Sequence, residues 1–264
     1  MKEFYKKRWL AIFPSFYIAY GIFYLIFTIR SRTLLFKGIP AWRLILTMIG
    51  MDGYLAYRIP DFYILGEWFT GALIILYLIY PLLLRCKRLF PYVFTAALFL
   101  YLFTIDHSLS GMEAFRTIAS CLISFIFGME MMKFIRSRVA LTVSVLTFLF
   151  LAFSFAPIQD VGVAAHLAGF SLVIILYHIG TLVERADFFR VLNGRIAGLT
   201  YQIFLVQHVV IDLVLAEFST YFRRPVLLVI AAGLSVFFAA VVKQIQKPFS
   251  HFQGSGKKQL DNPV

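Results

Sequence analysis

Long apolar runs, separated by short basic or polar segments, form the main pattern of this sequence. A helix needs about 20 mostly apolar residues to cross a bilayer, and eight runs are near that length. We therefore predict an all-α fold, a polytopic bundle of about eight membrane-spanning helices. The third and fourth runs are short, so their flanks would have to extend them. The predicted spans are Leu10–Thr28, Ile64–Leu84, Pro91–Ile105, Ile118–Met132, Val139–Ala156, Val163–Val183, Gly198–Phe218 and Pro225–Val242.

Composition agrees with a membrane protein and excludes several other classes. Of the 264 residues, 61% are apolar, 18% are aromatic and only 14% are charged, whereas a soluble domain carries about 25% charged residues. The same values exclude a disordered chain, a collagen and a disulfide scaffold. The two cysteines, Cys86 and Cys121, provide neither a disulfide framework nor a zinc-type cluster, and we do not expect them to pair.

The net charge of +12 follows the span pattern. If the amino terminus is cytoplasmic, 17 of the 25 Lys and Arg residues fall in segments on the inner side and eight fall on the outer side. Basic residues concentrate in this way on the cytoplasmic side of membrane proteins. We therefore predict a multi-pass protein with both termini cytoplasmic, the lipid bilayer as a partner and no nucleic-acid partner.

One predicted outer loop, Ile29–Tyr63, departs from the charge rule because it carries five basic residues. Its apolar stretch Ile39–Met48 is too short to span, which favours an interfacial or re-entrant segment. Loops often carry chemistry on a rigid scaffold, although a solvated linker would give the same pattern. We treat residues 1–249 as one transmembrane domain and residues 250–264 as a flexible cytoplasmic tail.

Polar side chains within predicted spans are costly and therefore informative. His208 and Asp212 are four residues apart in the seventh span, so they project from one face of the helix. A carboxylate can orient an imidazole that acts as a general base, and the same pair could instead only satisfy each other's buried polar atoms. These two residues are our candidates for catalytic proton transfer.

Other charged positions also have a structural and a functional interpretation. Glu67 and Trp68 open the second span, where a helix dipole favours an acid and the interface favours Trp. Lys7 and Arg8, next to Lys6, could attract the phosphates of a nucleotide-like donor or of anionic lipid. Glu130 can pair with Lys133, three residues further along the helix.

We predict no metal site. His166 and His178 share a span but are twelve residues apart, about 18 Å along the helix, so they cannot bind one ion together. The chain also lacks HExxH, phosphate-loop, GxSxG and paired-Cys motifs, which leaves soluble-type hydrolases and metalloproteins without support.

Three segments together resemble the integral-membrane acyltransferase family called acyltransferase type 3. FYKKRWLAIFPSFYIAY is similar to the family's helix beginning RxxRIxP, and EWFTGALIILYLIYPLL keeps the spacing of its W-to-YP stretch. LTYQIFLVQHVVI is similar to the late SYxIYLxH helix, and FGM to the middle-helix FLLGM. The matching segments are Phe4–Tyr20, Glu67–Leu83, Leu199–Ile211 and Phe127–Met129, with the closing KPF at Lys247–Phe249.

The resemblance implies an enzyme of the bacterial cell membrane that transfers an acyl group other than aminoacyl. The donor would be acyl-CoA, here acetyl-CoA, with no bound cofactor, and the acceptor a hydroxyl of a cell-envelope polysaccharide or a related molecule. Lys7 and Arg8 would bind the donor, while Glu67, Trp68 and Tyr201 would line the acceptor site in the membrane.

The sequence also departs from the family pattern. Ala11 replaces the second Arg of RxxR, Leu73 and Ile74 replace an acidic pair, and Gln207 stands where the late His is common. Family members have ten helices, and the first holds the catalytic His. This chain starts at what resembles the third helix, and its first histidine is His107.

Two explanations of the short start are open. In the first, Met1 is an internal start of a longer protein. In the second, the short form is genuine. It would then be inactive, or it would need a partner in a homo- or hetero-oligomer that supplies the absent helices. An alternative function is a non-enzymatic polytopic protein, such as a glycan export component or an assembly partner. The DNA upstream of Met1 distinguishes the two explanations.

Overall fold

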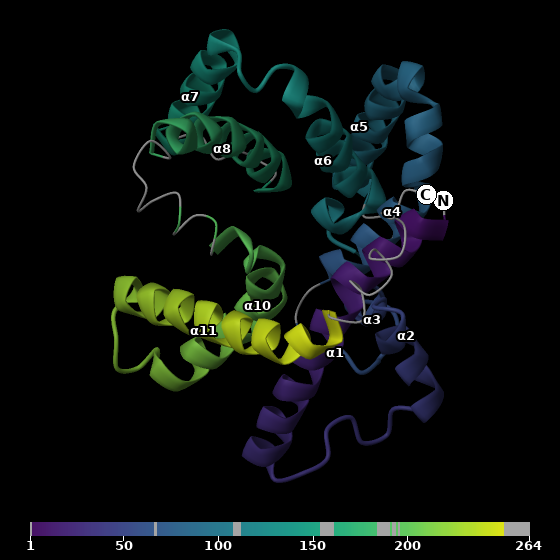
Figure 1. The fold of residues 1–264 in the computed structure, drawn as a ribbon, viewed down its shortest axis with the longest axis vertical. Helices are drawn as coiled ribbons and strands as arrows, with labels where there is room; N and C mark the ends of the chain where they lie inside the picture. The colour runs from purple at the N-terminus through teal and green to yellow at the C-terminus, as the bar shows by residue number, and fades with distance from the viewer. Residues whose placement is uncertain are drawn as a thin grey trace, which may run out of the picture. The chain divides into compact units, whose positions relative to one another are not determined.

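The computed structural model describes residues 2–65, 68–107, 112–153, 161–183, 191, 194 and 196–250. Every described part of the chain is helix, turn or loop, and no strand occurs in it. Each of the eight predicted runs forms a helix (Figure 1). The helices are α1 (Lys2–Ser31), α4 (Phe69–Arg85), α5 (Phe90–His107), α6 (Ile118–Glu130), α7 (Arg138–Phe153), α8 (Val161–Val183), α10 (Thr200–Phe218) and α11 (Arg224–Ser250).

Among the described residues, five helices are long and apolar enough to cross a membrane: α1, α5, α8, α10 and α11. α4 and α7 are shorter apolar helices, and α6 has 13 residues. The protein is therefore a helical membrane protein, and the span count of eight stays a prediction. Short 3₁₀ helices flank the longer ones: η1 (Ala41–Arg43), η2 (Lys87–Leu89), η3 (Ala114–Arg116) and η4 (Met131–Lys133).

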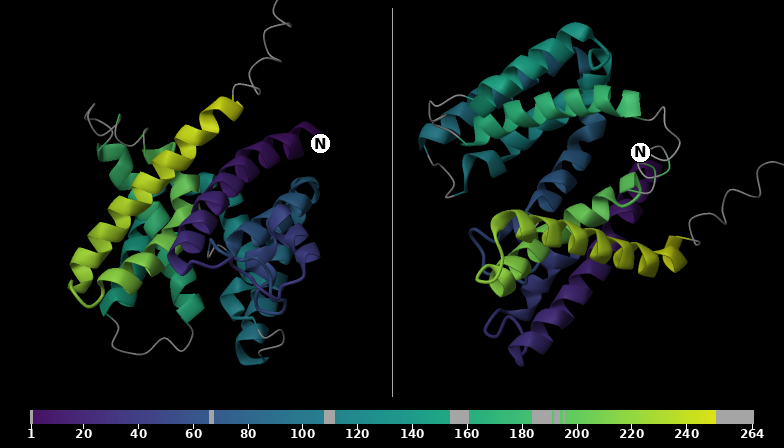
Figure 2. Two further views of the ribbon diagram at one scale, coloured as in Figure 1. Left: turned by 90° about the horizontal axis from the view of Figure 1, so that it is seen from below. Right: turned by 90° about the vertical axis from the view of Figure 1, so that its left-hand side faces the viewer.

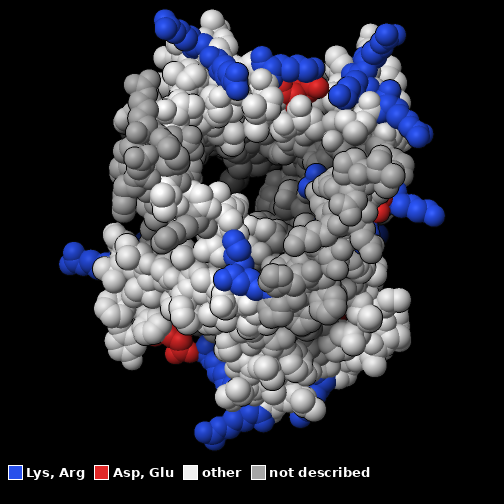
Figure 3. All heavy atoms as spheres, in the orientation of Figure 1, with Lys and Arg blue, Asp and Glu red and all other residues white. Residues whose placement is uncertain are grey.

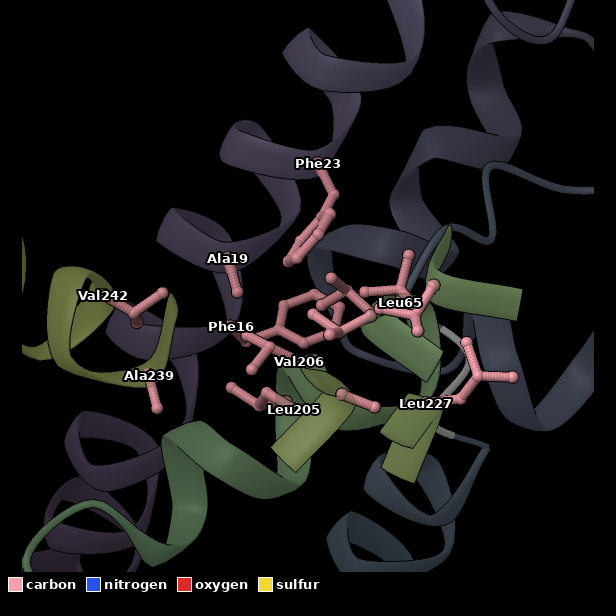
Figure 4. Packing of buried hydrophobic residues seen from close by; sticks show 13 residues of the cluster. Phe16, Ala19, Phe23, Leu65, Leu205, Val206, Leu227, Ala239 and Val242 are labelled. Carbon is pink, nitrogen blue, oxygen red and sulfur yellow. The ribbon is translucent and has the colours of Figure 1, made fainter. Parts of the chain in front are cut away.

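The chain divides into two compact units. The first comprises residues 1–71 and 195–264, and in it α10 and α11 form a hairpin that packs against α1 (Figure 2). Figure 4 shows the core of this unit, where apolar side chains from all three helices interdigitate around Phe16, Phe23 and Leu205. Leu65, which lies just before α4, completes the same core.

The second unit comprises residues 72–194. In it α5 packs against α6, and α7 packs against α8. Tyr101, with 1% of its surface exposed, is at the centre of an apolar cluster with Ala97, Ala119 and Ile123.

The predicted outer loop folds back along α1. It contains η1 and two short helices, α2 (Leu44–Met48) and α3 (Asp52–Leu55), and Gly50 turns the chain between them with a φ of 68°, which glycine adopts easily. Tyr17 donates a hydrogen bond to the carbonyl oxygen of Met48. Tyr20 donates one to the carbonyl oxygen of Phe62 at 2.7 Å.

Within Ile39–Met48, the side chains of Trp42, Ile45 and Met48 are more than half exposed, while Thr47 is buried. The stretch contacts α1 through Met48, and its interfacial or re-entrant placement stays a prediction.

Candidate functional site

The first unit contains two of the segments that carry the family resemblance, Phe4–Tyr20 and Leu199–Ile211, and the start, up to Gly71, of the third, Glu67–Leu83. Phe69, at the start of α4, contacts Phe204 of α10 edge-on, with ring centroids 5.8 Å apart. Trp68 contacts Phe69 at 5.8 Å, and Tyr201 stacks on Phe204 at 6.3 Å. Trp68 and Tyr201, two predicted acceptor-site residues, are therefore joined by a continuous row of four aromatic rings.

The loop between α1 and α4 places two acids in the same unit as this row. Asp52 is the first residue of α3, and Asp61 directly precedes Phe62. Asp52 is only 4% exposed and Asp61 only 6% exposed. Thr47, which is only 4% exposed, lies against both Asp52 and Tyr20. We call the group of side chains formed by Tyr20, Thr47, Asp52 and Asp61 the acid pocket, a name for this cluster and not for a cavity.

Burial sets the charge state of the acid pocket. It raises the pKa of Asp52 from its ordinary value to about 7, and the nearby charge of Asp61 adds to this, while the Gly53 backbone amide opposes it. Burial likewise raises the pKa of Asp61 to about 6, while the backbone amide of Tyr63 and the positive charge of Arg43 act to lower it. Near neutral pH the pocket can therefore both hold and accept a proton.

Few groups compensate the Asp61 carboxylate. Both Asp61 oxygens are buried and, within the described part of the chain, have no hydrogen-bond partner that meets ordinary geometry. The Arg43 guanidinium instead donates a hydrogen bond to the carbonyl oxygen of Pro60 at 2.7 Å. A buried acid without full compensation is a feature of functional sites more than of structural ones.

Close backbone packing fixes the pocket against α4. A Cβ added at Gly71 would lie 2.5 Å from Tyr54 Cβ and 3.3 Å from the carbonyl oxygen of Gly50. Only glycine permits this approach of the α2–α3 turn to the start of α4. Thr70, the neighbouring residue, is 1% exposed.

The remaining predicted binding residues are Lys7, Arg8 and Glu67. Lys7 and Arg8 lie in the first turns of α1 with exposed side chains, and Arg8 is over the ring of Phe4 at 5.4 Å. Glu67 lies outside the described residues. Basic side chains predominate over acidic ones on the face in Figure 3.

His208 and Asp212 share one face of α10, as their spacing predicts, but that face is exposed. The opposite face packs into the core through Leu205, Val206 and Val209. Although both residues are described, no hydrogen bond or ion pair joins their side chains in the described part of the structure. The buried, mutually satisfied pair that we considered does not form, and the catalytic role stays a prediction.

A polar network within the unit was not predicted. The Ser15 hydroxyl of α1 donates to Gln246 Oε1 of α11 at 2.6 Å, and the Gln202 amide of α10 donates to Ser15 at 3.0 Å and to Gln246 at 3.2 Å. Ser15 is fully buried and Gln202 nearly so. The network thus joins the three helices of the first unit.

A second unpredicted polar cluster lies in the other unit. Ser120 Oγ is 2.8 Å from His166 Nε2, and Ser124 Oγ is 3.1 Å from His166 Nδ1. The two serines of α6 thus occupy both ring nitrogens of the α8 histidine. His178 contacts the carbonyl oxygen of Ile135 at 2.9 Å.

Two smaller predictions are confirmed. Glu130 and Lys133 form an ion pair. Cys86 and Cys121 are free thiols. Among the described residues, no group of three or more His, Cys, Asp or Glu side chains could hold a metal ion.

The acid pocket gave only a weak signal in the sequence. Asp52 and Asp61 are isolated acids in a loop, so nothing in their spacing indicates that they are buried close together. The usable signal was the short apolar stretch Ile39–Met48, whose length favours an interfacial or re-entrant segment.

No protein-family model matches the chain, and neither a curated protein nor a solved structure matches it.

Proposed function

We propose that this protein is a membrane-embedded O-acyltransferase of a bacterial cell membrane. It would transfer an acyl group, here acetyl, from acyl-CoA to a hydroxyl of an envelope polysaccharide or a related acceptor. One observation carries the proposal: the α1 segment, the start of α4 and the α10 segment of the family resemblance lie in one unit that also holds two buried acids. The motifs supply the reaction class, and the acid pocket supplies a group that can move a proton.

In this proposal the acceptor hydroxyl lies between the aromatic row and the acid pocket. Its oxygen attacks the thioester carbonyl carbon of the donor, the carbon–sulfur bond breaks, and an ester forms. Asp52 takes the hydroxyl proton and passes it to the leaving thiolate of CoA. A general base works best when its pKa is near the operating pH, and the pKa of Asp52 meets this condition.

The remaining residues take binding roles. Trp68 and Tyr201 provide flat apolar surfaces for a sugar ring, and Glu67 a hydrogen-bond acceptor at the same segment. Lys7 and Arg8 attract the donor phosphates at the other end of the first span. We assign the proton transfer to Asp52 in preference to His208 and Asp212, because a base must reach its substrate in a site that excludes water.

Labelled donor tests the proposed activity. Membrane vesicles that contain the full chain, and vesicles without it, are given [14C]acetyl-CoA, and the glycan fraction is counted. We expect label in an alkali-labile ester only with the chain present. Absence of both donor binding and transfer would contradict the proposal, and glycan flux in donor-free proteoliposomes would favour the export alternative.

A further inference from the structure

A groove between α10 and α11, on the first unit, is separate from the acid pocket. It has a volume of about 450 Å³. One wall is the stripe of α10 that includes Ile203, Ile211 and Leu215, and the other is formed on α11 by Leu228, Ala232 and Val236. The small side chains of α11 at this position create the hollow between the two helices.

The groove has an apolar length and one charged end. Ile203 and Leu215 are twelve residues apart, which is about 18 Å of helix and close to the thickness of one leaflet, half of about 30 Å. Arg224 lines the groove at the α10–α11 turn, the same end as Leu215. Within the described residues, Arg224 forms no ion pair, whereas Arg30 pairs with Glu217 at 2.5 Å.

We infer that this groove binds an anionic phospholipid, with one acyl chain along the apolar walls and the headgroup phosphate at Arg224. Arg224 is exposed at the mouth of the groove, where it attracts an anion, and an anionic headgroup provides one where the hydrocarbon begins. A zwitterionic lipid would fill the same hollow but would leave more of the positive charge uncompensated. The site therefore selects lipids by headgroup charge.

Lipid retention tests the inference without acyl donor, so its outcome is independent of the proposed function. The full chain is reconstituted with equal amounts of phosphatidylglycerol and phosphatidylcholine and extracted in detergent, and bound lipid is measured by native mass spectrometry. We expect phosphatidylglycerol to be retained preferentially. Arg224→Gln should lower the preference about fivefold, and Arg224→Lys should keep most of it.

Two further variants locate the site. Arg223→Gln removes a neighbouring charge that does not line the groove, so it should change the preference much less than Arg224→Gln. Ala232→Leu should reduce retention of both lipids by filling the hollow. Equal retention of the two lipids by the unaltered chain, or equal effects of Arg223→Gln and Arg224→Gln, would overturn the inference.

Discussion

The hydroxyl of Tyr20 donates a hydrogen bond to the backbone carbonyl oxygen of Phe62 at 2.7 Å. This bond links the middle of α1 to the residue that follows Asp61. Together with the bond from Tyr17 to Met48, it holds the loop against α1. The position of the acid pocket therefore depends on two tyrosines of a helix that is otherwise apolar at this level.

Removing the Tyr20 hydroxyl should loosen the loop. Tyr20→Phe leaves the Phe62 carbonyl without its partner, which should cost about 1 kcal/mol of stability, and the thermal midpoint in detergent should fall. Tyr24→Phe is the matched control, because Tyr24 stacks on Tyr20 at 6.4 Å and forms no hydrogen bond to the described residues of the loop. Equal shifts in the two variants would argue against the anchoring role.

Gly71 provides a test of the close packing against α4. In Gly71→Ala the new methyl would meet Tyr54 Cβ at 2.5 Å, so the backbone must move, at a cost of about 1–3 kcal/mol. Gly233→Ala in α11 is the control, since nothing lies within 4 Å of its Cβ position and alanine favours helix. We expect the thermal midpoint to fall in Gly71→Ala and to stay unchanged or rise in Gly233→Ala. The opposite order would mean that the turn does not pack as described.

The acids of the pocket should make stability depend on pH. Their pKa values are raised in the folded protein, to about 7 for Asp52 and about 6 for Asp61. The folded state therefore holds more protons than the unfolded chain between about pH 4 and 7, and its stability falls as the pH rises through this window. The thermal midpoint should drop from pH 5 to pH 8, and it should drop less in Asp52→Asn.

Asp212→Asn is the control for the pH measurement, because Asp212 is exposed on α10. It should keep the pH dependence of the unaltered protein. A wild-type midpoint that rises over the same window would show that the acids are not buried as described.

The Gln202 network should stabilise the packing of α1, α10 and α11. Gln202→Ala removes the amide that donates to Ser15 and Gln246 and leaves buried groups short of partners, at a cost of about 1–3 kcal/mol. Gln244→Ala, on the exposed side of α11, should be nearly neutral. The difference between the two midpoints measures the network.

Helix positions could be predicted because each apolar run is bounded by charge or turn residues. The predicted run Gly198–Phe218 and the observed α10, Thr200–Phe218, differ by two residues at one end. The same pattern could not show which face of α10 is buried, since apolar residues surround a membrane helix. His208 and Asp212 were correctly placed on one face, and the exposure of that face depends on packing against α1 and α11.

The acid pocket could not be predicted for a related reason. Asp52 and Asp61 are brought together by a turn at Gly50, by the approach of Tyr54 to Gly71 and by two tyrosines of α1. These are contacts between segments that are distant in the sequence, and no periodicity encodes them. By contrast, Trp68 and Tyr201 were expected in one site because the family resemblance placed them there. The aromatic row connects the two residues, and their shared site stays a prediction.

Acetyl transfer by three variants tests the central claim, that Asp52 moves the proton, most directly. Vesicles with the full chain, Asp52→Asn, Asp61→Asn or His208→Ala are given labelled acetyl-CoA, and the initial rate of ester formation is measured at matched protein levels. We predict that Asp52→Asn lowers the rate by about 10²-fold or more, that Asp61→Asn has a smaller effect, and that His208→Ala changes it little. Full activity in Asp52→Asn, with loss in His208→Ala, would contradict the account.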